Sequence, residues 1–435
     1  MLTFSFKNSQ ISASQIKRYG TVLAGYVATL QDVMKQRSYD CYESSILLSG
    51  NRQEIKEIQN HAKQFISSAL RYVIVIGIGG SNLGAKAIYD ALLGSTDTIS
   101  IQRFPKLICL DTCDVHTAQT VMQTLQQEIV SSDQYIINVI SKSGSTAETV
   151  ANTAYFFQMG AQKLPEFEKR VVITTDEDSV LWKMSKEKGY TSLAIPKKVG
   201  GRYSAFSSVG LFPLACLGID IAQVCKGAQW ALRQGISDRI EKNPSAQSAI
   251  ALVSQYTKRN VIHDTFFFAP ALETLGKWYR QLFAESLGKV PLGKKNTKAI
   301  GITPTVSIGS TDLHSMAQLY LANPTSRFTT FVSIAKTIDT PRLNGSEWTA
   351  LVPGLQGQTL HGLMKTIYQG VVNTYTAKKM PFVQIDMKEC SAFTLGAFMQ
   401  MKMLEVMYCA HVLGVNAFDQ PHVEIYKKEV RKLLK

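Results

Sequence analysis

Short apolar runs alternate with amphipathic helical patterns along most of the chain. In the first half, apolar or β-branched runs of four to six residues are bounded by turn or polar residues, a pattern typical of buried strands. After the first run, Leu83, Ala87 and Ala91 recur every four residues and Gly94 follows as a stop, which predicts an amphipathic helix. The predicted strands of this half are residues 72–76, 107–110, 135–140 and 171–174.

The same alternation restarts after about residue 225. Strands are predicted at 265–268, 304–308, 328–334 and 382–385, and two helices, 394–412 and 423–434, close the chain. Strands separated by helices indicate parallel sheets that helices cover. We therefore predict an α/β fold with three segments: an N-terminal helical arm (1–40), a first domain (41–225) and a second domain with the closing helices (226–435).

The amino-acid composition of the chain limits the kinds of molecule that it is expected to bind. The chain has 435 residues, 45% of them hydrophobic, which suits a globular protein, and 47 basic against 33 acidic residues give a net charge of +14. Basic residues are scattered in short pairs such as Lys197-Lys198 and Lys378-Lys379, and we find no nucleic-acid-binding sequence pattern. We expect a solvated basic surface that attracts small anions, and no nucleic-acid partner.

The seven cysteines bear on the cellular compartment. Their number is odd and they contain no C-x-x-C, which argues against a disulfide framework and a zinc ribbon and favours a reducing cytoplasm. The N-terminus lacks the layout of a signal peptide, and Pro213 and Asp220 interrupt the longest apolar stretch, so we expect no membrane partner. The histidines show no metal-ligand spacing, and we predict no metal site.

A glycine-rich turn follows the first predicted strand. The run VIVIGIGGSNLG ends this strand in Gly77, Gly79, Gly80 and Ser81 and then opens a helix. Glycines let the backbone approach a ligand closely, and a helix N-terminus favours negative charge, so the turn is a candidate anion site. The third glycine of a dinucleotide fingerprint would fall on Asn82, so that interpretation fails. A turn with only a structural role is the alternative.

A second polar run, SKSGSTAET, follows the strand at 135–140. Ser145 and Glu148 have the spacing of a helix capping box, so part of the run has a structural explanation. The residues of this run that have no structural explanation are Ser141, Lys142, Ser143 and Thr146. Hydroxyls, loop amides and a lysine suit a phosphate monoester, but their spacing is not that of a nucleotide-triphosphate loop. We predict that this run binds a sugar phosphate.

Glu285 occupies a helix position where an apolar residue is expected. It continues the stripe of Leu275, Trp278 and Leu282, spaced three and four residues apart. Because an unpaired buried carboxylate is costly, Glu285 either pairs with Lys289 one turn later or acts as a general base in a partly dry cleft. The accompanying motifs favour the base.

Three basic residues have both an ordinary and a functional interpretation. Arg202 follows Gly200 and Gly201 in a loop, and it is either a surface arginine or a fixed charge that stabilises an oxyanion. His314 falls in the first turn of a helix after the strand at 304–308, where it either only caps the helix or packs, or else exchanges protons. Lys427 borders the apolar stripe of the last helix, and its spacing alone indicates a surface residue.

Together these segments resemble the glucose-6-phosphate isomerase family, also called phosphoglucose isomerase, in its shorter bacterial-type form. The resemblance extends over most of the chain, with the motifs in the family's order and roughly its spacing. The motifs are GIGGSNLG from Gly77, SKSGSTAET from Ser141, GGRYS from Gly200, QLFAESLGK from Gln281, STDLHS from Ser310 and FDQPHVEIYK from Phe418. The family pattern usually has glycine at the position of His422.

The resemblance implies two sugar-isomerase domains, each a mainly parallel sheet flanked by helices, and reversible isomerisation of glucose 6-phosphate and fructose 6-phosphate without metal or organic cofactor. Glu285 would move a proton between C1 and C2 through an enediolate, Arg202 would stabilise the enediolate, and His314 and Lys427 would assist ring opening. The sugar would contact Gly80, Ser81, Gly201, Gln281 and Gln420, and the phosphate Ser141, Lys142, Ser143 and Thr146. In this family the neighbouring subunit supplies the histidine, which implies a homodimer with shared active sites.

Two other functions are compatible with parts of these motifs, and they differ in the residues and substrates that they require. A bifunctional phosphoglucose and phosphomannose isomerase would share the same residues and accept a second sugar. A non-catalytic phosphosugar-binding regulator would need only the phosphate-binding half of the site. The presence of Glu285, His314 and Lys427 argues against the regulator.

Overall fold

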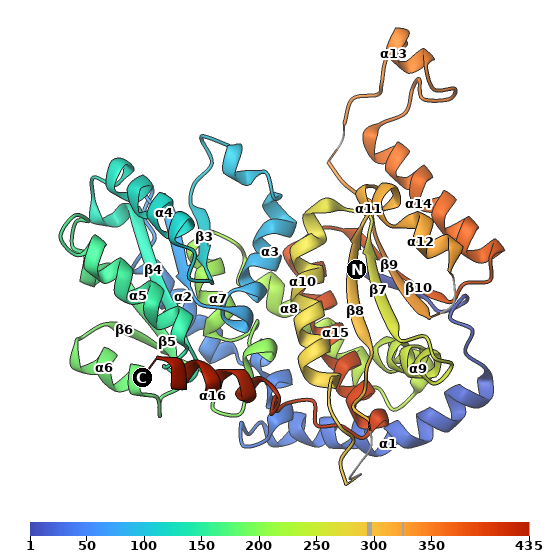
Figure 1. Ribbon diagram of the computed structural model, residues 1–435, viewed down its shortest axis with the longest axis horizontal. Coiled ribbons are helices and arrows are strands. Elements are labelled where there is room, and N and C mark those ends of the chain that lie inside the picture. Colours follow the sequence, from blue (N-terminus) through green and yellow to red (C-terminus); the bar gives the residue numbers. More distant parts are fainter. Residues whose placement is uncertain (294–297, 324–325, 339, 435) are drawn as a thin grey trace.

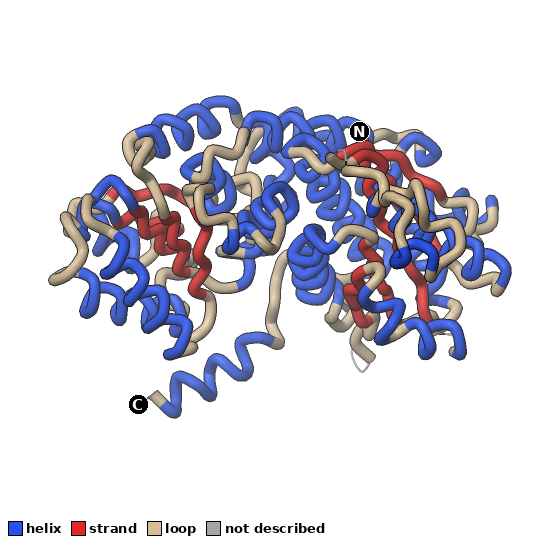
Figure 2. The backbone as a smooth tube through the Cα atoms, turned by 90° about the horizontal axis from the view of Figure 1, so that it is seen from above, coloured by secondary structure: helices blue, strands red, loops and turns tan. Residues whose placement is uncertain are grey.

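Two five-stranded sheets lie at opposite ends of the molecule, with helices packed between them (Figure 2). The computed structural model describes residues 1–293, 298–323, 326–338 and 340–434. The arrangement is the predicted α/β fold with parallel sheets flanked by helices (Figure 1).

The first sheet is parallel throughout, in the order β3-β2-β4-β5-β6. Its strands are β2 (Tyr72–Ile76), β3 (Lys106–Leu110), β4 (Tyr135–Ile140), β5 (Val171–Thr175) and β6 (Thr191–Ala194). β2, β4 and β5 are buried along their whole length, which explains why continuous apolar or β-branched runs marked them in the sequence. β6 was not predicted, because this edge strand is short and only partly buried.

The second sheet has the order β1-β10-β9-β7-β8, and β1 is its antiparallel edge strand. Its strands are β1 (Leu2–Ser5), β7 (Ile262–Phe267), β8 (Thr303–Ile308), β9 (Arg327–Lys336) and β10 (Phe382–Glu389). The first residues of the expected helical arm therefore form a strand, and the helix α1 starts only at Ala13. We keep the division into 1–40, 41–225 and 226–435 as a proposal.

The helices follow the predicted pattern. Leu83, Ala87 and Ala91 lie on α3, which ends at Gly94 with a φ of 84°. The helices are α1 (Ala13–Gln36), α2 (Arg52–Lys63), α3 (Leu83–Leu93), α4 (Val115–Glu128), α5 (Ala147–Gly160), α6 (Val180–Glu187), α7 (Ser208–Cys216), α8 (Ile221–Gly235), α9 (Pro244–Thr257), α10 (Glu273–Leu287), α11 (Thr311–Ser315), α12 (Ala317–Ala322), α13 (Glu347–Ala350), α14 (Leu360–Ala377), α15 (Ala392–Leu413) and α16 (Val423–Leu433).

One large apolar core joins the two halves of the chain. It contains Val73 and Ile136 of the first sheet and Ile385 of the second, together with side chains of α3, α7, α8, α10 and α15. α15 is buried around most of its circumference, and α10 packs against both α3 and α15. This shared core orients the loops of the first sheet toward α10. In the described part of the chain, no helix has the length and apolarity needed to cross a membrane.

The strand order also predicts where a ligand binds. From β2 the chain continues to β3 on one side, whereas β4 lies on the other side of β2. The loops that leave neighbouring strands in opposite directions open a crevice at their carboxyl ends, where α/β proteins commonly bind ligands. The glycine-rich turn follows β2 and the SKSGST run follows β4, so both predicted anion-binding segments border this crevice.

Candidate active site

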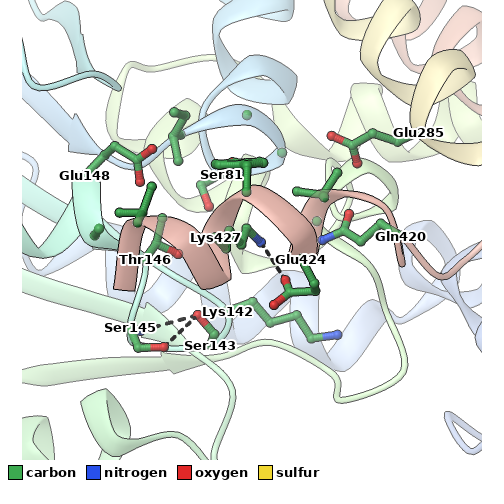
Figure 3. Close-up of a pocket in the computed structure, with 18 of the residues that line it drawn as sticks. Ser81, Lys142, Ser143, Ser145, Thr146, Glu148, Glu285, Gln420, Glu424 and Lys427 are labelled. Carbon is green, nitrogen blue, oxygen red and sulfur yellow. Dashed lines mark hydrogen bonds and ion pairs between the residues drawn. The ribbon is translucent and has the colours of Figure 1, made fainter. Parts of the chain in front are cut away.

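A cleft of about 820 Å³ opens beside the carboxyl ends of β2 and β4 (Figure 3). The loops after β2, β4 and β5 form one side, and α10, α16 and the turn around Arg202 complete the wall. The predicted residues that line it are Gly80, Ser81, Lys142, Ser143, Thr146, Gly201, Arg202, Gln281, Glu285, Gln420 and Lys427. Ser141 and His314 do not line it.

Glu285 and Arg202 face each other inside this cleft. Arg202 is only 3% exposed, and its Nη1 lies 3.3 Å from Glu285 Oε2. Gln281, one turn earlier on α10, donates from Nε2 to the other carboxylate oxygen at 2.9 Å. Because the Glu285 side chain is 27% exposed, a ligand in the cleft can reach it. A carboxylate next to a buried cation suits proton transfer at a carbon whose neighbouring oxygen becomes negative.

The remaining donors of Arg202 hold the chain around it. Its Nε donates to Ser286 Oγ at 2.8 Å, and its Nη2 donates to the carbonyl oxygens of Ala417 and Asp419 at 2.6 and 2.9 Å. The planar guanidinium thus connects α10 with the segment that leads into α16. This network fixes the direction of the positive charge toward Glu285.

Lys289 does not pair with Glu285, so the structural explanation considered for Glu285 is wrong. The Lys289 ammonium instead lies 2.7 Å from the Asp419 carboxylate and donates to the carbonyl oxygen of Asn416. Burial lowers the pKa of Lys289, and Asp419 acts in the opposite direction. Lys289 and Arg202 anchor the same segment, which leaves the Glu285 carboxylate directed into the cleft.

Gly80 has a packing role that its motif did not reveal. A Cβ atom at this position would lie 2.2 Å from the carbonyl carbon of Gly201 and 2.7 Å from the Arg202 nitrogen. Real Cβ atoms do not approach backbone this closely, so a side chain at Gly80 would displace the turn that carries Arg202. The glycine-rich turn therefore sets the position of the guanidinium as well as lining the cleft.

The SKSGST run forms a hydroxyl-rich seat at the start of α5. Ser143 and Ser145 lie within hydrogen-bonding distance of each other, and Ser141 donates to Thr146 Oγ1 at 3.2 Å. The proposed capping box between Ser145 and Glu148 does not form: Thr146 is the N-cap residue and makes no side-chain cap bond. The first amides of α5 therefore stay available for an anion, together with the hydroxyls.

Lys142 lines the cleft, but its ammonium is directed elsewhere. Nζ donates to the carbonyl oxygens of Lys197 and Val199, each at 2.7 Å, and Figure 3 shows the side chain extending away from Ser143 and Ser145. Burial lowers the pKa of Lys142, opposed by Asp176. The lysine ties the seat to the loop that precedes Gly200 and Arg202.

Lys427 and His314 lie in different surroundings. Lys427 reaches the cleft from α16, where Nζ lies 3.0 Å from Glu424 Oε1. His314 lies on α11, immediately after β8 of the second sheet, and its side chain is exposed. One chain therefore brings Lys427, but not His314, to Glu285 and Arg202.

Comparisons with known proteins decide the family. The family model described as phosphoglucose isomerase matches residues 48–435. The chain belongs to the phosphoglucose isomerase family. A glucose-6-phosphate isomerase of Mycoplasmopsis synoviae is 32% identical over 397 residues, 88% of this chain and 87% of that protein. A probable glucose-6-phosphate isomerase of Methanococcus maripaludis is 30% identical over 388 residues, 89% and 83% of the two chains.

Solved structures agree with this fold. A hypothetical protein of Thermus thermophilus superposes with a TM-score of 0.87 at 26% identity, over 100% of both chains. A glucose-6-phosphate isomerase of Chlamydia trachomatis superposes with a TM-score of 0.81 at 18% identity, over 100% of this chain and 88% of that one. Membership of the phosphoglucose isomerase family makes this chain an aldose-ketose isomerase of glucose 6-phosphate and fructose 6-phosphate, as predicted, and favours neither alternative.

Several residues that line this cleft were not predicted from the sequence. They are Ser145, Glu148, Asp176, Asp178, Ser179, Glu424 and Arg431. Ser145 and Glu148 had a helix-capping explanation, and the spacing of Glu424, Lys427 and Arg431 along one helix face was the signal available for α16. Nothing in the sequence placed the loop after β5 at the cleft. Within the described ranges no cluster of histidine, cysteine, aspartate or glutamate could hold a metal ion.

Proposed function

We propose that this cleft carries out the isomerisation, with Glu285 as the base that moves the proton. The observation behind this assignment is the Glu285 carboxylate 3.3 Å from the buried Arg202 guanidinium, in the same cleft as the hydroxyl-rich seat. From the open-chain aldose, Glu285 takes the C2 proton; the electron pair moves into a C1–C2 double bond and the carbonyl oxygen becomes an oxyanion. A proton then passes from the C2 hydroxyl to the C1 oxygen, so that the negative charge moves to the C2 oxygen. Return of the first proton to C1 converts C1 into CH2OH and C2 into the carbonyl, which gives the ketose.

Arg202 stabilises the enediolate in this proposal. Negative charge develops on the oxygens bonded to the reacting carbons. The Arg202 guanidinium is already fixed by Ser286, Ala417 and Asp419, so it need not reorganise when this charge develops. Gln281 holds the carboxylate orientation, and Ser81, Gly201 and Gln420 border the space for the sugar. An assay that feeds fructose 6-phosphate and detects glucose 6-phosphate through a dehydrogenase tests the function. Absence of turnover in the wild type would overturn it.

Ring opening requires a group that exchanges a proton with the ring oxygen. Lys427 lines the cleft, whereas His314 is exposed on the second sheet's side of the same chain. We propose that His314 serves the cleft of a second copy, so that a homodimer has two shared sites. The segment with α13, which projects from the body in Figure 1, supports a protein partner: Trp348 is 72% exposed, and Leu351 and Val352 are exposed beside it.

The phosphate of the substrate is proposed to bind Ser143, Thr146 and the first amides of α5. Replacing Ser143 and Thr146 together by alanine should raise the Michaelis constant for fructose 6-phosphate roughly ten- to hundredfold, since each hydroxyl contacts a charged group. Phosphate contacts exist in ground and transition states alike, so kcat should fall no more than the Michaelis constant rises. Steady-state kinetics measures both, with Thr120→Ala on the exposed side of α4 as a control. A defect in kcat alone would argue against the assignment.

A cytoplasmic location completes the proposal. All seven cysteines are free thiols, as a reducing compartment would leave them. Interconversion of these two hexose phosphates is a step of glycolysis and gluconeogenesis, and the family assignment supports that role.

A further inference from the structure

The seat for the phosphate has fewer available cations than the sequence suggested. The cationic residues that line the described cleft are Lys142, Arg202, Lys427 and Arg431. The Lys142 ammonium is engaged by two carbonyl oxygens, and Arg202 is committed to Glu285 and the chain before α16. The carboxylates of Glu148, Asp176 and Asp178 line the same cleft, and only that of Asp178 has an ion pair among the described residues, with Lys197 at 2.6 Å.

A phosphate monoester brings a charge of about −1.5 to −2 at neutral pH into this seat. The hydroxyls of Ser143, Ser145 and Thr146 are neutral, and a helix N-terminus supplies only a partial positive charge. The neighbouring carboxylates disfavour the anion. A cation from elsewhere in the cleft would therefore improve phosphate binding substantially.

Arg431 is in a position to supply this cation. α16 runs along the cleft from the side of Gln420 and Glu285 to the side of Thr146 and Glu148 (Figure 3), with its C-terminal end near the first sheet (Figure 1). Arg431 is one turn beyond Lys427, and a helix rises about 6 Å over four residues. The backbone position of Lys427 on α16 is thus nearer the reacting carbons, and that of Arg431 is nearer the seat.

The resting contacts of Arg431 are weak and local. Its Nη2 lies 3.2 Å from Glu424 Oε2, the carboxylate that also holds Lys427, and its side chain is 63% exposed. The side-chain hydrogen bonds and ion pairs found for the described residues of α16 all lie within this helix, and none of its residues is buried. An exposed ion pair of this kind contributes little, so Arg431 can leave it readily.

We propose that Arg431 is a further substrate-binding residue, which leaves Glu424 and binds the phosphate oxygens above Ser143 and Thr146. The proposal rests on the function proposed for this cleft. Glu424 and a phosphate compete for Arg431, since both are anions that a guanidinium binds through N–H donors. When the substrate binds, its phosphate replaces the Glu424 carboxylate as the partner of Arg431. The C-terminal end of α16 then moves toward Ser143 and Thr146.

Arg431→Ala tests this role against Lys432→Ala, a matched control on the same helix. Lys432 carries the same charge, is exposed and pairs with Glu429, and it does not line the cleft. Arg431→Ala should raise the Michaelis constant for fructose 6-phosphate and the inhibition constant of inorganic phosphate roughly tenfold each, with kcat within about twofold. Arg431→Lys should raise the Michaelis constant and the inhibition constant by less than Arg431→Ala does. Lys432→Ala should leave the Michaelis constant, the inhibition constant and kcat within about twofold of the wild-type values.

A double-mutant cycle tests whether Glu424 and the phosphate compete for Arg431. Glu424→Gln removes the competing carboxylate and should lower the inhibition constant of phosphate more in the wild-type background than in Arg431→Ala. An unchanged phosphate constant in Arg431→Ala, equal losses in Arg431→Ala and Lys432→Ala, or a loss confined to kcat would overturn the proposal. Failure of the proposed function is distinguishable, because the wild-type chain would then not turn over fructose 6-phosphate.

Discussion

Glu285→Gln should lower kcat by about 10²- to 10⁴-fold while the Michaelis constant for fructose 6-phosphate changes only a few-fold, the range expected when a general base is lost. The amide has nearly the same shape as the carboxylate and keeps one oxygen as an acceptor, so the Gln281 contact and the packing of α10 can persist. It cannot take a proton from carbon. Steady-state kinetics with the coupled assay measures the loss.

Glu273→Gln is the matched control for this experiment. Glu273 begins the same helix, is about half exposed and pairs with Lys277 at 2.8 Å, and it does not line the cleft. The control should retain wild-type kcat and Michaelis constant. A Glu285→Gln protein that keeps nearly the wild-type rate would remove Glu285 from the role of base.

Pairing a Glu285→Gln subunit with a His314→Ala subunit should restore activity that neither variant has alone. If each cleft uses Glu285 of one copy and His314 of the other, a mixed dimer has one cleft with both substitutions and one with neither. A purified mixed dimer should therefore have about half of the wild-type activity per dimer. If both residues acted within one chain, each cleft would keep one substitution and activity would stay low.

Two different affinity tags on co-expressed subunits allow the mixed dimer to be isolated. Tagged wild-type dimers provide the reference, and dimers of each single variant provide the baselines. Activity of the mixed dimer at the baseline of the single variants would contradict the shared site. Thermal unfolding of every dimer separates a loss of chemistry from a loss of folding.

Most of the fold could be predicted because burial leaves a strong pattern. The runs at 72–76 and 135–140 match β2 and β4, whose residues are all buried. β1 and β6 escaped prediction because each has four residues and lies at a sheet edge, where partial exposure removes the continuous apolar pattern. β1 also pairs with β10, hundreds of residues away, and no local signal reports such a contact.

The membership of the site was more predictable than its contacts. Loops after parallel strands meet at one sheet edge, so Gly80 and Ser143 could be assigned to a common cleft from their motifs. The direction of the Lys142 ammonium could not, because it depends on carbonyl oxygens of a loop more than fifty residues later. The ion pair of Lys289 could not be predicted either, because its partner, Asp419, lies on the segment before α16, far away in the sequence.

Proton exchange with solvent tests the central claim most directly. In deuterium oxide, wild-type protein incubated with fructose 6-phosphate over many turnovers should incorporate deuterium at C2 of glucose 6-phosphate, detected by proton NMR, because a carboxylate that carries the proton exchanges it with water. Glu285→Gln should lose this incorporation along with turnover. Interconversion by the wild type without any deuterium at C2, or undiminished incorporation by Glu285→Gln, would contradict proton transfer by Glu285.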